Sequence, residues 1–127
     1  MSTQEMVQSL HDQVTRHIAT ANSLYDSGHY DWALFMWHLA LEKTLKARMI
    51  TQNKDRLYIH DLLRLATAAD LDLTPDEIDE LTEINSFNIE ARYDDFKTAF
   101  YLKATKQYAD QWKSISMKLY KKFLLSV

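Results

Sequence analysis

Apolar residues recur along most of the chain at the three- and four-residue spacing of amphipathic α-helices. Between Thr3 and Ser27 this spacing continues for several turns, and Gly28 follows at the place where a left-handed residue would end the helix. The segment from Asp31 to Gln52 is apolar on nearly every side at its start, which predicts the central and most buried helix.

Three further helices are predicted in the second half of the chain. The polar stretch TQNKDRLYI indicates a loop, and a short helix follows over residues 60–70. Thr74, Pro75 and Glu77 fit the N-cap, the first helical position and the capping box of a helix that continues to about Ile89. The stretch EARYDDF interrupts the periodicity, and a last helix is expected from Thr98 to Leu125. The predicted fold is all-α: an up-and-down bundle of four main helices plus one short helix, with residues 1–127 forming a single domain.

The composition supports this interpretation and narrows the functions. One glycine and one proline are few for a sheet with tight turns. The absence of cysteine excludes disulfides and thiolate sites and fits a reducing cytoplasm, where we expect the protein. The N-terminus has no signal-peptide pattern and no apolar run is long enough to cross a bilayer, so no membrane association is expected. A net charge of −3 argues against general DNA binding.

The charge is distributed unevenly. Residues 70–95 hold ten carboxylates and one arginine, whereas residues from Lys97 to the end hold seven lysines and one aspartate. Two interpretations follow. Neighbouring helices could pair these faces with each other, or the lysines could form a basic strip for nucleic acid or an acidic partner.

Several chemistries lack their residues. A single glycine cannot supply the glycine-rich loops that hold phosphates. No histidine has a glutamate three positions before it, so the Glu-x-x-His pattern of di-iron bundles is absent, and histidine–cysteine zinc sites are impossible. We therefore expect no metal and no cofactor.

A polar line interrupts the second helix. His38, Glu42 and Lys46 follow each other at four-residue steps, and Lys43 lies beside them. Such residues share one face of a helix. They could form ordinary Glu–Lys pairs, or an anion-binding or subunit-contact strip.

Three motifs in a fixed order now suggest a family. The second helix, the HDLxxL turn and the ARYxD segment together resemble the HEPN domain (higher eukaryotes and prokaryotes nucleotide-binding), over essentially the whole chain. The matching residues are Tyr30, Ala33, Ala40, Glu42, Lys43, Leu45 and Lys46, then His60, Asp61, Leu62 and Leu65, then Ala91, Arg92, Tyr93 and Asp95. Asp94 departs from the family pattern, because many members carry proline there.

The resemblance implies two different activities. Many HEPN proteins are metal-independent ribonucleases in which an arginine is followed after four to six residues by a histidine, and two copies form the site. No histidine falls in that window after any arginine of this chain. Arg56 and His60 are one residue too close, and Leu57 stands where a polar residue is usual. We therefore predict no catalytic residues.

The resemblance favours a non-catalytic, homodimeric interaction module that works with a minimal nucleotidyltransferase, as in a toxin–antitoxin pair, and binds a nucleotide or RNA. The alternative is a HEPN ribonuclease toxin with a degenerate site. For His60 a structural role is also open, fastening the loop against the second helix, and for Arg92 a role in binding helix-end carbonyls or nearby carboxylates. The predicted ligand- or partner-binding residues are Lys43, Lys46, His60, Arg92 and Tyr93.

Overall fold

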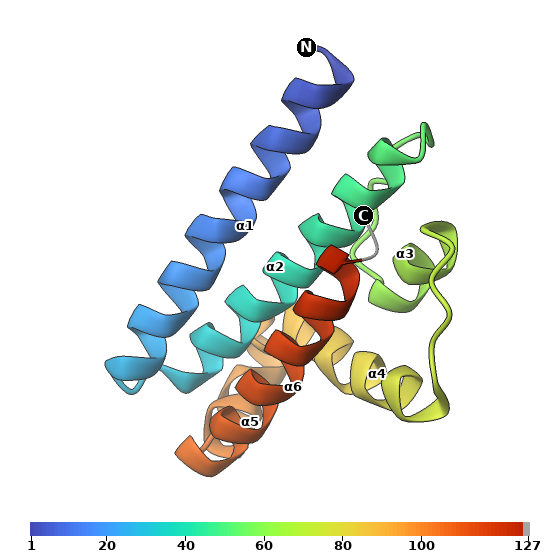
Figure 1. Cartoon of the computed structure of the whole chain (residues 1–127). Coiled ribbons are helices and arrows are strands. Elements are labelled where there is room, and N and C mark those ends of the chain that lie inside the picture. Colours follow the sequence, from blue (N-terminus) through green and yellow to red (C-terminus); the bar gives the residue numbers. More distant parts are fainter. Residues whose placement is uncertain (126–127) are drawn as a thin grey trace.

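The computed structural model describes residues 1–125, and within that range every regular element is a helix (Figure 1). The all-α prediction is therefore confirmed; residues 126 and 127, which the predicted domain includes, lie outside the described range. The helices are α1 (Thr3–Asp26), α2 (Tyr30–Thr51), α3 (Leu62–Ala68), α4 (Pro75–Glu90), α5 (Asp94–Lys103) and α6 (Lys106–Leu125).

Helix α2 is the centre of the molecule, as its sequence predicts. α1 runs antiparallel along it, and α3, α4 and α6 pack on its other sides (Figure 1). Buried residues follow each other along α2 from Ala33 to Ile50 on all of its faces. Trp37, at 1% exposure, is among the largest fully buried side chains of the core. A polar group on such a helix needs a partner, because water does not reach it.

The turn between α1 and α2 depends on Gly28. This glycine has φ +80°, a left-handed conformation that side chains with a Cβ adopt only with strain. The amides of Gly28 and His29 donate to the carbonyls of Tyr25 and Leu24, which ends α1. The chain can then reverse and pack α2 against α1.

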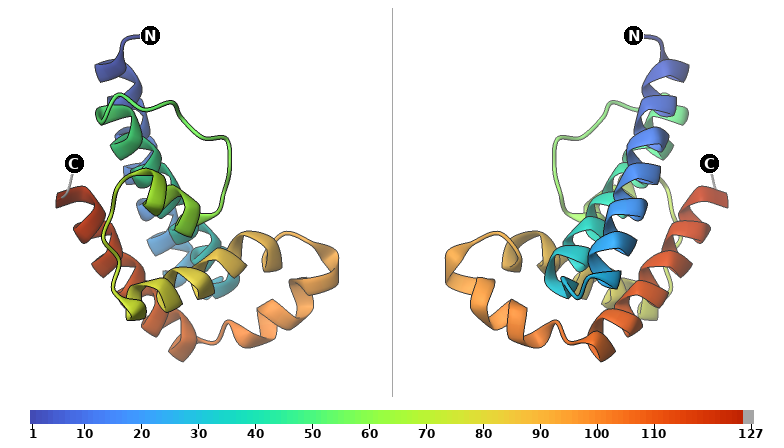
Figure 2. Two further views of the ribbon diagram at one scale, coloured as in Figure 1. Left: turned by 90° about the vertical axis from the view of Figure 1, so that its right-hand side faces the viewer. Right: turned by 90° about the vertical axis from the view of Figure 1, so that its left-hand side faces the viewer.

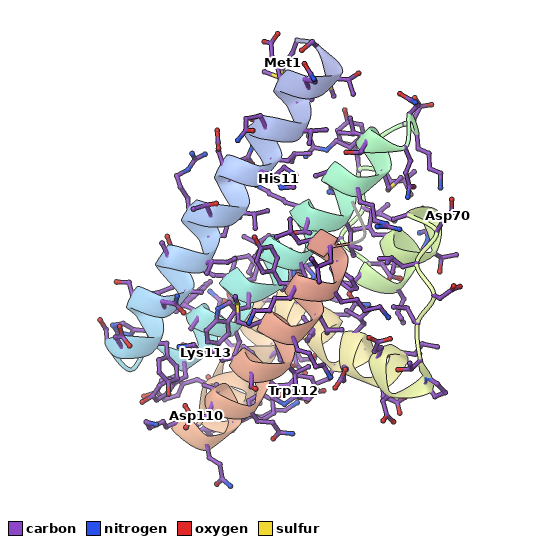
Figure 3. All side chains as sticks on the ribbon, viewed as in Figure 1. Met1, His11, Asp70, Asp110, Trp112 and Lys113 are labelled. Carbon is purple, nitrogen blue, oxygen red and sulfur yellow. The ribbon has the colours of Figure 1, made fainter. Side chains whose placement is uncertain are left out.

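The turn is also attached to α6. Tyr25 donates a hydrogen bond to Asp110, and the ammonium group of Lys113 lies 4.5 Å from the centre of the Tyr25 ring. Figure 3 shows Asp110 and Lys113 at the end of α6 that lies nearest to this turn.

The acidic segment 70–95 and the lysine-rich segment that follows it form ion pairs with each other. α4 begins with the predicted capping box of Thr74 and Glu77, with Pro75 at its start. Its carboxylates then bind lysines of the following helices: Glu77 with Lys122 at 2.6 Å, Glu80 with Lys118 at 3.1 Å and Glu83 with Lys103 at 3.1 Å. Three of the seven lysines beyond residue 96 are thus bound to α4. The interpretation of complementary neighbouring faces is confirmed for these lysines.

The prediction of four main helices plus one short helix is wrong in number. The expected last helix, Thr98 to Leu125, is divided into α5 and α6 at Ala104 and Thr105. Ala104 leaves the helical conformation with ψ 64°, and the Thr105 hydroxyl accepts a hydrogen bond from the amide of Tyr108. Thr105 is thus an N-cap for α6, a signal that the continuing apolar pattern concealed.

An aromatic cluster explains why the break is stable. The ring of Phe87 in α4 lies 5.6 Å from that of Phe100 in α5, and about equally close to Tyr108 and Trp112 in α6, at 6.1 Å each. Because the chain breaks into two helices here, aromatic side chains of both α5 and α6 can pack against the Phe87 ring of α4.

Candidate functional site

The polar line on α2 is buried. His38 is 0% exposed and Glu42 and Lys46 are 3% exposed each, although all three carry polar or charged groups. Such groups persist in a core only when hydrogen bonds or opposite charges compensate them. Their partners therefore determine what this part of the protein can do.

Glu42 is held by two nitrogen donors. The Lys46 ammonium lies 3.0 Å from Oε2, and Nδ1 of His60 lies 2.8 Å from Oε1. Burial raises the pKa of the Glu42 carboxyl, but the hydrogen bonds from Lys46 and His60 outweigh it, and the net shift of the pKa is downward. Glu42 is therefore an anion inside the core.

His38 completes this network as a neutral imidazole. Its Nε2 lies 3.2 Å from the backbone oxygen of His60, so Nε2 carries the proton and donates it. Its Nδ1 is 4.0 Å from Glu42, too far for a hydrogen bond, and has no partner within the described residues. Burial lowers the pKa of His38 to about 4, more than the neighbouring Glu42 charge raises it.

The HDL motif fixes the loop that precedes α3. Asp61 is the N-cap, and its carboxylate accepts from the amides of Leu63 and Arg64. Asn85 of α4 donates to Asp61 at 2.9 Å and accepts from the amide of Leu62 at 2.8 Å. The helix therefore starts two residues later than predicted.

His60 fastens the loop against α2, which is the structural role considered for it from the sequence. Two contacts do this, the ring on Glu42 and the backbone oxygen on His38. The His60 side chain nevertheless remains 57% exposed. One edge of its ring thus binds the core while the other faces outward.

Lys43 contacts α1, whereas Lys46 contacts Glu42 of its own helix. The Lys43 ammonium donates to Gln13 of α1 at 2.5 Å. Burial lowers the pKa of Lys43; Glu42 raises it, and the positive charges of Arg56, Lys46 and Arg16 lower it further. Lys43 therefore belongs to a cationic environment between α1 and α2.

Arg92 and Tyr93 lie beside the first half of α2. The Arg92 guanidinium donates through Nε to the carbonyl of Asn88 at 2.8 Å, which is the helix-end contact considered from the sequence. It also lies 5.5 Å from the Phe35 ring and 5.7 Å from the Tyr93 ring. Both Arg92 and Tyr93 are exposed.

The five predicted site residues thus form separate groups. Glu42 brings Lys46 and His60 together. Lys43 joins α1, and Arg92 stacks on Phe35, which is eight residues, or about 12 Å along the axis, from Lys43. Figure 2 shows the loop 52–61 and the α4–α5 junction on the same side of α2, opposite α6. Their role in binding stays a prediction.

Sequence reasoning did not select Tyr58 or Arg16. Tyr58 is 86% exposed and belongs to the loop next to His60. The available signal was an aromatic residue in an otherwise polar segment. Arg16 could be linked to Lys43 only once the packing of α1 on α2 was known.

Comparisons with known proteins agree with the motifs. The model of the HEPN domain family matches residues 7–125, so the chain belongs to the HEPN family. In fold it is similar to the crystal structure of TT1696 from Thermus thermophilus, with a TM-score of 0.80 and 20% identity over 94% of this chain and 96% of that one. No curated protein matches the sequence.

Two further properties concern the described residues alone. Between residues 1 and 125 no helix has the length and apolar character needed to cross a membrane. In the same range no group of three or more histidine, aspartate or glutamate side chains is arranged to hold a metal ion.

The buried His38 predicts a pH dependence of stability. Below about pH 6.5 the unfolded imidazole binds a proton, whereas the folded one does so only near pH 4. Stability should therefore fall as pH is lowered through this interval, by about 3 kcal/mol from His38 alone. Urea unfolding across the interval measures the loss.

The matched variant is His38→Gln, which retains an N–H donor for the His60 carbonyl but does not titrate. Its free energy of unfolding should decline less than that of the wild type over the same interval. Glu42 also loses stabilisation in acid, because its folded pKa is depressed, but that loss is common to both proteins. Parallel pH profiles for the two proteins would contradict this account of His38.

Proposed function

We propose that this HEPN protein is a non-catalytic binding module that acts as a homodimer with a nucleotidyltransferase-type partner. One observation carries the non-catalytic part: no arginine of the chain is followed by a histidine after four to six residues. The network around Glu42 agrees with it, because Lys46 and His60 hold a loop in place. A chain without cysteine suits the cytoplasm, where we place the pair.

The dimer proposal is supported by an exposed aromatic surface on α5 and the adjoining start of α2. We call it the α5 face. Its Trp32, Lys97 and Tyr101 line one surface hollow. Asp94 and Lys97 of this face form an ion pair of 3.5 Å within one chain, and two copies related by a twofold axis could exchange these partners across the interface. The large apolar side chains of the α5 face and their exposures are Trp32 39%, Tyr93 55%, Phe96 47% and Tyr101 65%.

A ribonuclease with a degenerate site is the second candidate, and one observation favours it. A buried carboxylate binds Nδ1 of an exposed histidine in the Glu42–His60 pair. Carboxylates orient catalytic imidazoles in this way, leaving Nε2 to move a proton. Against this second candidate, no arginine of the chain lies at the family spacing before a histidine.

We expect purified protein without metal to leave single-stranded and structured RNA uncut above background. The reason is the empty histidine window after each arginine. Gel analysis of labelled RNA in the presence of a chelator measures this. Cleavage that is lost in both Arg92→Ala and His60→Ala, while Arg64→Ala retains it, would instead establish the ribonuclease.

Light scattering should give a mass of twice the 15.0 kDa chain at micromolar concentration. Charge at the centre of an apolar interface costs about 2 kcal/mol or more, so Phe96→Glu should weaken the dimer about thirtyfold or more. Tyr58→Glu is the matched control, since Tyr58 is exposed but lies outside the α5 face. A monomer at high concentration would refute the dimer.

Co-expression with the product of the neighbouring gene, followed by mass measurement, tests the partner.

A further inference from the structure

Two of the seven lysines beyond residue 96 are not bound to a carboxylate, and both are on α6. Within residues 1–125, no carboxylate oxygen lies within 4.0 Å of the ammonium group of Lys113 or Lys121. The other five form ion pairs, three of them with α4. Internal pairing therefore explains most of this basic segment but not these two cations.

Lys113 and Lys121 lie in line with two apolar side chains that the core does not bury. Lys113, Met117 and Lys121 follow each other at four-residue steps and line one open hollow of about 520 Å³. Leu124, which is 38% exposed, comes seven residues after Met117, or two helical turns, and so lies on the same side of α6. We call these four residues the α6 strip. Met117 has one lysine a turn before it and the other a turn after it.

The α6 strip has no partner within the described chain. The opposite side of α6 buries Leu119 and Phe123, both 0% exposed, in the core. Figures 1 and 2 show α6 at the outside of the molecule, and no other helix between residues 1 and 125 lies over its outer side. Met117 is half-buried and, among the described residues, belongs to neither core cluster. The strip thus combines free positive charge with uncovered apolar surface.

Lys113 is already held in place by a neighbouring ring. Its ammonium group lies 4.5 Å from the centre of the Tyr25 ring (Figure 3 labels Lys113). Asp110, which also lines the hollow, is bound to Tyr25 and Lys106 instead. An ammonium group on a ring face keeps donors free on its other side. A carboxylate from outside would therefore meet an ordered cation, and little conformational entropy would be lost on binding.

The carboxylates beside the strip favour a protein helix over a nucleic acid. Asp110 lines the hollow, and Glu80 is bound to Lys118, which lines it as well. These two carboxylates would repel a continuous phosphate backbone, and such a backbone would have no use for Met117 and Leu124. An amphipathic helix can place separate carboxylates on the free lysines and an apolar side chain between them.

We propose that the α6 strip binds an acidic amphipathic helix of a partner protein. Two carboxylates of that helix pair with Lys113 and Lys121, and an apolar side chain midway between them packs on Met117. The two lysines are eight residues apart, about 12 Å along the axis, and carboxylates eight positions apart on the partner helix have the same separation. This interaction goes beyond the proposed function, because it requires neither the dimer, which uses the α5 face, nor a nucleotidyltransferase.

A fluorescent helical peptide of about 20 residues is the probe, with Glu, Leu and Glu at successive four-residue steps. A matched peptide has the same composition but carries its Leu on the opposite side of the helix. Fluorescence anisotropy at low salt measures the affinity of each for the wild-type protein. The first peptide should bind about fivefold or more tightly, because only it buries an apolar side chain on Met117.

Two variants test the strip with this first peptide. Lys121→Glu should weaken binding by about tenfold or more, because an attractive charge pair becomes a repulsive one. Met117→Gln should weaken binding by about threefold or more, because apolar contact is lost. If Lys121→Glu lowers the melting temperature, Lys113→Glu provides the same test from the other end of the strip.

Arg64→Glu is the matched control for net charge. Arg64 is exposed on α3, and no carboxylate of the described residues lies within 4.0 Å of it. This variant changes the net charge as much as Lys121→Glu does and should bind the first peptide as the wild type does. Equal losses in Arg64→Glu and Lys121→Glu would overturn the proposal, because they indicate unspecific attraction.

Further outcomes would also overturn the proposal. Wild-type protein that binds neither peptide, or both equally, does not recognise the pattern of the strip. If an RNA duplex or phosphatidylglycerol vesicles bind more tightly than the first peptide and lose this affinity in Lys121→Glu, the strip binds that polyanion instead. If light scattering shows that Lys121→Glu turns a dimer into a monomer, the strip is an interface between two copies of the chain.

Discussion

The structure depends on one buried carboxylate, that of Glu42 in the central helix α2. Glu42 is 3% exposed and is surrounded by a lysine of its own helix and a histidine from the following loop. An unpaired charge at such a position costs several kcal/mol, so Glu42 remains ionised only while both donors are in place. This requirement joins α2, the loop 52–61 and the start of α3 into one unit.

The need to pair charges also explains why several lysines are neutralised inside the protein. Lys46 forms an ion pair with Glu42, and three lysines of α5 and α6 form ion pairs with carboxylates of α4. Lys43 instead lies between α1 and α2, in a cationic environment that includes Arg16 and Arg56.

Local signals in the sequence predicted much of this fold. The spacing of apolar residues gave α1 and α2, Gly28 gave their turn, and the Thr74–Glu77 box gave the start of α4. The break at Thr105 was missed because apolar residues continue across it, and only the packing around Phe87 shows that two helices are needed. The start of α3 was predicted two residues too early, because the sequence alone does not show that the Asp61 carboxylate accepts from the amides of Leu63 and Arg64.

The candidate site was less predictable, for a geometric reason. Lys43 and Lys46 are three residues apart, which places them about 60° apart around the helix. On a surface helix that is one face, but α2 has neighbours on every side, and 60° is enough to direct one lysine to α1 and the other to Glu42. Which neighbour each lysine meets is a property of tertiary packing.

The most direct measurement of the central claim is a double-mutant cycle on Glu42 and Lys46, followed by urea unfolding at neutral pH. Glu42→Gln and Lys46→Met should each destabilise the protein by about 3 kcal/mol, because each leaves a buried partner uncompensated. The double variant should cost less than the sum of the two by about 1 kcal/mol or more. If the two single effects are small, or if they simply add, the buried carboxylate does not organise this fold.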